Sequence, residues 1–166
     1  MLKRSRTARS LRTDARQAVA SCAGWNARLL ARRLTQFFAD RMADASLSFA
    51  QLGLMAETAS ADDDTISALA ERMGLDQSTL SRTLRTLEAD GLVEIAVAEA
   101  DQRRRLVWLT EKGARTLEAA LATWRKAQAE LSRRLSVDLV RTLALGTEAL
   151  AGDTGEPARK LVPANG

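Results

Sequence analysis

The sequence predicts a mainly α-helical protein with one small β-hairpin, and three observations support this fold class. Apolar residues recur at helical spacing through most of the 166 residues. Two short runs of β-branched and aliphatic residues, 92–97 and 105–109, interrupt that spacing. The first run directly follows two short helical segments joined by a tight turn. The expected order is helix, helix, helix-turn-helix, hairpin, helix, helix, which is the arrangement of a winged helix-turn-helix.

The N-terminal part divides into a basic arm and a long helix. Residues 1–13 are rich in arginine and show no apolar stripe, so we expect a flexible basic arm. From Asp14 to about Met42 the apolar residues follow a helical period. At roughly 1.5 Å per residue, a helix of this length is longer than a small domain is wide. Part of its apolar surface therefore needs a partner outside the monomer core.

Three shorter helices come next, and capping residues predict where each begins. Ser, Thr and Asp accept a hydrogen bond from the first helical turn, which favours them just before it. The candidate caps are Ser46 or Ser48 for a helix to about Ala59, Thr65 for a helix to Met73, and Asp76 for a helix to about Asp90. Gly74 and Gly91 suit the left-handed conformation in which many helices end. The acidic stretch 60–64 is predicted to be a loop.

The C-terminal half begins with the hairpin. The charge-dense segment 98–104 is expected to form its tip. Thr110 can then cap a long helix to about Leu135, and Ser136 a last helix that includes Leu150. Apolar stripes on both long helical regions favour packing against a twofold mate. The predicted parts are an arm (1–13), a dimerisation helix (14–45), a winged lobe (46–113), two more dimerisation helices (114–151) and a flexible tail (152–166).

The helix-turn-helix spacing predicts a surface that reads DNA. Ala70 at the helix crossing, Gly74 in the turn and Leu80 as the first inward residue fit a DNA-binding motif. Short hydroxyls and arginines then face outward; the candidate contacts are Ser78, Thr79, Ser81, Arg82 and Arg85. Arginine can bind guanine through two hydrogen bonds, and Ser or Thr can contact bases or phosphates. The alternative is a solvated face, but such faces usually carry acids, and this one has none before Glu88.

The hairpin supplies a second basic cluster at its tip. Arg103, Arg104 and Arg105 can enter a minor groove or bind phosphate. Asp101 cannot touch DNA favourably, so its expected role is to pair with a nearby arginine and hold it in place. The alternative is a solvated turn with incidental charge.

Three motifs between residues 65 and 120 resemble one known family. They are the run LAERMGLDQSTLSRTLRTLEADGLV, the D-x-R element at 101–103, and the L-T-x-x-G entry to the next helix at 109–113. Together they are similar to the multiple-antibiotic-resistance regulator (MarR) family of bacterial transcription factors. The resemblance implies a homodimer on a palindromic operator in double-stranded DNA, with repression more often than activation. It also implies release by a small molecule, often an aromatic acid. By motif position, Ser78, Thr79, Ser81, Arg82 and Arg85 form the recognition face, with Arg103 as the wing contact and Asp101 as its support.

Two candidate signals stay open. Some members of the family place a reactive cysteine in the first helix, which would make Cys22 a redox sensor. Those sensors surround the thiol with tyrosine hydroxyls, and this chain has no tyrosine; a buried, inert thiol is the alternative. The second signal is an aromatic or acidic effector near Trp25, Arg28 and Trp124, because tryptophan stacks on rings and arginine binds carboxylates. The alternative is that both tryptophans serve packing or the dimer interface.

Composition narrows the function class further. The chain has no histidine, which removes histidine-dependent nucleophiles, bases and metal ligands. Its single cysteine forms neither an internal disulfide nor a multi-cysteine zinc site. No apolar run can span a membrane, and the arginine-rich start lacks the apolar core of a secretory signal. We therefore expect a cytoplasmic regulator with no cofactor, membrane contact or enzyme activity; a winged helix for protein–protein assembly, without specific DNA binding, is the alternative.

The net charge of +4 is unevenly distributed. Residues 1–42 hold ten basic and two acidic residues, whereas residues 65–113 hold seven and eight. The prediction of DNA binding therefore depends on where the arginines of the lobe point, not on its net charge. The N-terminal surplus is expected to add phosphate contacts and salt sensitivity.

Overall fold

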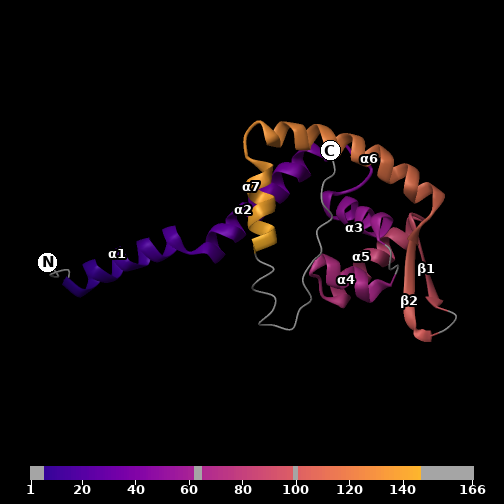
Figure 1. The fold of residues 1–166 in the computed structure, drawn as a ribbon, viewed down its shortest axis with the longest axis horizontal. Coiled ribbons are helices and arrows are strands. Elements are labelled where there is room, and N and C mark those ends of the chain that lie inside the picture. Colours follow the sequence, from indigo (N-terminus) through magenta and orange to yellow (C-terminus); the bar gives the residue numbers. More distant parts are fainter. Residues whose placement is uncertain (1–5, 62–64, 99–100, 147–166) are drawn as a thin grey trace. The chain divides into compact units, whose positions relative to one another are not determined.

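The computed structural model describes residues 6–61, 65–98 and 101–146, which contain seven helices and one hairpin. In chain order they are α1 (Arg6–Ser21), α2 (Ala23–Arg41), α3 (Phe49–Ser60), α4 (Ile66–Met73), α5 (Gln77–Ala89), β1 (Val93–Ala98), β2 (Asp101–Leu109), α6 (Glu111–Ser132) and α7 (Val137–Gly146) (Figure 1). The mainly helical fold with a small hairpin is confirmed. No helix among the described residues is long and apolar enough to cross a membrane. The chain divides into two compact units, Met1–Asp40 and Arg41–Gly166.

The N-terminal unit differs from the prediction in two ways. Helix α1 begins at Arg6, so the predicted arm is helical over residues 6–13; residues 1–5 lie outside the described part. Arginine, alanine and leucine all have high helix propensity, which explains the earlier start. The long helix expected from Asp14 is also interrupted at Cys22. The side-chain amide of Asn26 donates to the carbonyl of Ala20 (3.1 Å), which in a continuous helix would accept from Gly24.

The caps of the winged lobe lie where the sequence predicts. Ser48, rather than Ser46, begins α3 through a capping box: its hydroxyl accepts from Gln51 N (3.2 Å), and its own N–H donates to Gln51 Oε1 (2.9 Å). Thr65 caps α4 by accepting from Ala68 N (3.3 Å). Gly74 ends that helix at φ 60° and ψ 36°, the left-handed region that disfavours a side chain.

The hairpin is longer than predicted. Strand β2 starts at Asp101 rather than Arg105, so most of the predicted tip is strand; residues 99–100 lie outside the described part. The antiparallel ladder runs from the pair Val93 and Leu109 to the pair Ala98 and Asp101. Backbone pairing does not require apolar side chains, so a charged residue such as Arg105 can pair in the ladder with Val97. The register shifts between Val97 and Ala98, which accommodates the extra residues of β2.

The core of the lobe lies among α3, α4, α5, the hairpin and the first half of α6 (Figure 1). Leu80, Leu84 and Leu87 on one face of α5 are fully buried. Burying each such side chain contributes roughly 1.5–3 kcal/mol. This packing fixes the rotation of α5, and with it the residues that the helix presents outward.

The C-terminal helices follow the predicted caps with a shorter α6. It ends at Ser132 rather than near Leu135, and Ser136 accepts from Leu139 N (3.2 Å) to begin α7. Leu139 and Leu143 on α7 are more than half exposed. Leu150 and the predicted tail 152–166 lie outside the described residues.

Candidate nucleic-acid interface

Helix α5 carries the predicted reading face on the side opposite its buried leucines. Ser78, Thr79, Arg82 and Arg85 are exposed, and Ser81 is half-buried. The gap between α4 and α5 is set by Ala70, which is 5% exposed at the helix crossing. The structure therefore brings the candidate recognition residues together on one accessible helix face.

Asp76, which the sequence indicated only as a cap, organises the first turn of that face. Its carboxylate accepts from Thr79 N (2.9 Å), from the Ser78 hydroxyl (2.5 Å) and from the Thr79 hydroxyl (2.7 Å). The hydrogen bond from the Ser78 hydroxyl, followed by those from Thr79, holds the pKa of Asp76 well below its usual range. The group is therefore a carboxylate near neutral pH. The sequence signal for this cluster is D-x-S-T at 76–79, which by itself predicts only the start of a helix.

Other hydroxyls on α5 are also engaged. Thr83 donates to the carbonyl of Thr79, and Thr86 to that of Arg82, both at 3.3 Å. Such bonds to the preceding turn are common for threonine within helices. Ser81 differs, because its hydroxyl has no hydrogen-bond partner within the part of the chain that the structure describes.

Two of the predicted wing arginines lie on β2 among the residues whose side chains are described. Arg104 and Arg105 are exposed and adjacent in β2, next to the register shift of the ladder. Their use as wing contacts to DNA stays a prediction. The side chains of Asp101 and Arg103 lie outside the described residues, so the predicted support and wing contact stay predictions. Trp108 donates from Nε1 to Glu94 Oε2 (3.0 Å), its partner directly across the ladder.

A compact set of hydrogen bonds joins the end of α5 to the start of α6. Thr110 donates from its hydroxyl to the carbonyl of Gly91 (2.8 Å) and from its N–H to that of Leu92 (3.1 Å). The same hydroxyl accepts from Gly113 N (2.9 Å). Lys112 Nζ donates to the carbonyl of Asp90 (2.6 Å). This junction fixes the recognition helix to the helix that follows the hairpin.

The candidate effector and redox residues belong to different parts of the chain. Trp25 and Arg28 are exposed neighbours, three residues apart on α2, in the unit Met1–Asp40. Trp124 lies on α6 in the other unit, where it packs against the lobe core. Cys22 is half-buried at the break between α1 and α2. Their proposed roles in sensing stay predictions.

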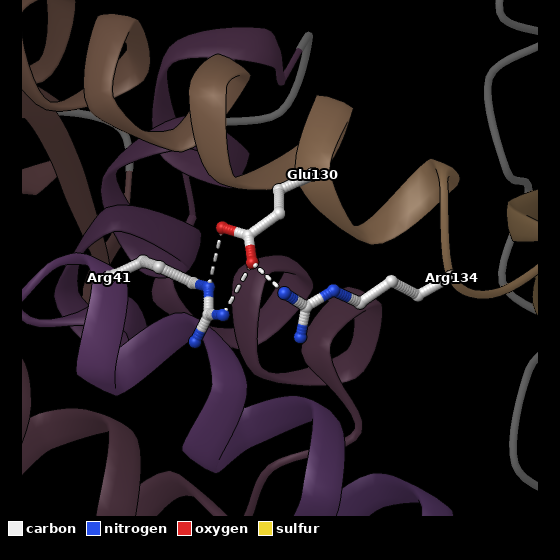
Figure 2. A network of polar contacts seen from close by, with 3 residues as sticks. All are labelled: Arg41, Glu130 and Arg134. Carbon is white, nitrogen blue, oxygen red and sulfur yellow. Dashed lines mark hydrogen bonds and ion pairs between the residues drawn. The ribbon is translucent and has the colours of Figure 1, made fainter.

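A charged network lies on α6, near the end of α2 (Figure 2). Glu130 accepts two hydrogen bonds from Arg41, from Nε at 2.9 Å and from Nη2 at 2.6 Å. Arg134 approaches the same carboxylate at 2.7 Å. The bidentate bond from Arg41 lowers the pKa of Glu130 below its usual value. Because the carboxylate of Glu130 is partly exposed, this network is expected to add to stability only modestly.

Stability should therefore fall in acid through Glu130. A carboxyl whose pKa is lower in the folded state stabilises the fold above its unfolded pKa, near 4.5, and loses this contribution as pH falls through the folded value. We expect the unfolding midpoint in urea to drop below about pH 4.5 more steeply in the wild type than in Glu130→Gln. Glu118→Gln, on the same helix, is the control and should keep the wild-type slope. Parallel profiles for wild type and Glu130→Gln would contradict the assignment.

Comparison with known proteins places these features among DNA-binding regulators. Residues 45–104 match the model of the MarR family. The chain is 38% identical over 88 residues to the HTH-type transcriptional regulator PetP of Rhodobacter capsulatus, covering 53% of this chain and 47% of that protein. It is 34% identical over 82 residues to the transcriptional regulator HosA of Escherichia coli O127:H6, covering 43% and 61%. The matches thus span about half the length of these curated relatives. The solved structure of the Mycobacterium tuberculosis regulator MOSR with DNA superposes with a TM-score of 0.71 at 30% identity, covering 80% of this chain and 98% of that one.

Proposed function

The chain belongs to the MarR family of transcriptional regulators, and we propose that it binds double-stranded DNA as a homodimer and represses transcription until a small ligand releases it. One observation carries the proposal: α5 turns Arg82 and Arg85 outward while Leu80, Leu84 and Leu87 anchor it in the core. A recognition helix needs such a rigid base and an exposed polar face. The DNA complex of the similar regulator MOSR supports the same use of the fold.

Selection of genomic fragments by the purified protein tests this function. The regulator proposal expects a small set of enriched fragments that share a palindromic element, and retarded migration of each fragment in a gel. A module for protein–protein assembly would enrich no sequence above the input. Genes beside the enriched fragments would then indicate which chemical class of effector to test.

Exposed apolar residues support the homodimer. Leu11, Val19 and Trp25 lie exposed in the N-terminal unit, and Leu139 and Leu143 lie exposed on α7. Exposed apolar surface of this kind favours association. A second copy that covered both helical regions, 14–45 and 114–151, would bury these side chains and present two α5 helices to a palindrome. On this proposal residues 46–113 form the DNA-binding lobe.

The proposed effector is an aromatic or acidic small molecule, and Trp25 with Arg28 supports it. An exposed indole ring can stack on an aromatic effector, while a guanidinium one turn away can bind a carboxylate. Redox release through Cys22 is the alternative signal. The absence of tyrosine from the sequence weighs against the tyrosine-lined form of that chemistry.

The basic face of α1 is proposed to bind DNA phosphates. Arg12 and Arg16 are exposed and lie four residues apart on one face of α1. Arg12→Gln with Arg16→Gln should reduce the slope of log affinity against log salt by about 0.9 for each phosphate that the variant no longer neutralises. Arg115→Gln, which removes an exposed arginine already paired with Glu111, is the matched control. An unchanged slope in the double variant would remove α1 from the DNA-binding surface.

A further inference from the structure

We infer that the two side-chain hydroxyls in the first turn of α5 present only hydrogen-bond acceptors to DNA, so that Ser78 and Thr79 select bases with an amino group in the major groove. The inference rests on the proposed function and adds a specificity rule to it. Asp76 acts as a positioning residue, because it sets the direction in which the two hydroxyl protons point.

Hydrogen-bond chemistry fixes that direction. An ionised carboxylate has no proton to give, so both hydroxyls must donate to Asp76 across their 2.5 and 2.7 Å contacts. Each hydroxyl has a single proton, and only its lone pairs remain for a ligand. Bonds to a charged acceptor are roughly twice as strong as neutral ones, so DNA contacts are expected to form around them rather than replace them.

The acceptor character of these two hydroxyls restricts what they can bind. In the major groove adenine N6 and cytosine N4 are donors, whereas guanine and thymine offer acceptors at O6, N7 and O4. Phosphate oxygens are acceptors too. Ser78 and Thr79 therefore match adenine or cytosine and do not match phosphate, guanine O6 or thymine O4.

The next turn of α5 has the opposite character. Arg82 and Arg85 have donors only, which match guanine O6 and N7. The exposed face of α5 thus carries an acceptor pair, Ser78 and Thr79, and one turn later a donor pair, Arg82 and Arg85. Each operator half-site should combine guanine with a nearby adenine or cytosine, read by successive turns of one helix.

The variant Asp76→Asn tests whether Asp76 makes the two hydroxyls acceptors, and it preserves the N-cap of α5. Asparagine caps helices about as well as aspartate. Its amide oxygen can accept from Thr79 N, but its NH₂ group is a donor, so at least one hydroxyl must accept from it and turn its own proton outward. That hydroxyl can then donate to guanine or thymine, and the restriction to adenine or cytosine should be lost at its position.

The experiment is binding-site selection from a randomised duplex library with the full chain. Ser78→Ala and Thr79→Ala first identify the positions that each residue reads, through loss of preference there. At those positions we expect the wild type to enrich adenine or cytosine, and Asp76→Asn to reduce this preference about two- to tenfold, the value of one neutral hydrogen bond. Preferences at the guanine positions read by Arg82 and Arg85 should stay unchanged. Thr79→Ser keeps the hydroxyl that Thr79→Ala removes, so it should show the wild-type preference at the position read by residue 79.

Ser81→Ala provides the matched control, because the Ser81 hydroxyl has no internal acceptor within the described residues and is not oriented by Asp76. Asp76→Asn should leave the base preference unchanged at the positions that Ser81 reads. The inference is overturned if Ser78 and Thr79 select guanine or thymine, or if Asp76→Asn leaves every preference unchanged. A wild-type protein that enriches no sequence would instead overturn the proposed function itself.

Discussion

Replacing both arginines of the α5 face, Arg82→Ala with Arg85→Ala, is expected to abolish specific DNA binding. Each arginine that binds guanine through two hydrogen bonds contributes about 1–3 kcal/mol of discrimination. Removing both arginines should therefore weaken binding to a selected fragment by roughly thirtyfold or more for each protomer. The measurement is fluorescence anisotropy at one fixed salt concentration, with selected and scrambled duplexes side by side.

The fold should survive this change, because both arginine side chains are exposed and neither belongs to the core. Arg125→Ala is the matched control: it removes an exposed arginine from α6, away from the recognition helix. It should keep specific binding and lower non-specific affinity at most slightly. Intact discrimination between the two duplexes in the Arg82 and Arg85 variant would show that another face of the protein reads DNA.

The reading face was predictable because it depends on local rules. A cap is decided within one helical turn, which is why Thr65, Asp76 and Thr110 begin helices where the sequence indicated. The burial of Leu80 then follows from helical periodicity and fixes which residues face outward. Two short-range signals, caps and apolar spacing, thus determine most of the helix-turn-helix.

The features that sequence reasoning missed depend on particular side-chain hydrogen bonds and on backbone pairing, which apolar periodicity does not specify. At the interruption at Cys22 the side-chain amide of Asn26 donates to the carbonyl of Ala20, a contact that periodicity does not reveal. The extent of β2 to Asp101 depends on pairing across the hairpin, where the register shifts. The direction of the hydroxyls near Asp76 depends on rotamers, which no spacing rule specifies.

Gly113 belongs to the L-T-x-x-G motif, and its surroundings explain why this position requires a glycine. A Cβ on this glycine would lie 1.9 Å from the carbonyl oxygen of Leu92 and 2.9 Å from its carbonyl carbon. Both atoms are backbone, and the oxygen already accepts from Thr110 N. The glycine is therefore required by the close approach of α6 to the start of the hairpin, not by a left-handed conformation.

Gly113→Ala should consequently destabilise the fold by at least about 3 kcal/mol, at the upper end of overpacking effects. The clash can be relieved only by moving the start of α6 away from Gly91 and Leu92, which would break the hydrogen bonds of Thr110. Unfolding in urea, followed by circular dichroism, measures the loss. The matched control is Gly53→Ala within α3, where an added Cβ would meet nothing within 4 Å.

The control is expected to change stability in the opposite direction. Alanine has the higher helix propensity, so Gly53→Ala should stabilise the protein by about 0.5–1 kcal/mol. The same chemical change in two helices thus separates backbone entropy from steric overlap. Equal effects at both sites would mean that α6 does not approach Leu92 this closely. A large loss of unfolding free energy at Gly113 alone would show that the L-T-x-x-G motif serves to hold the recognition helix against α6.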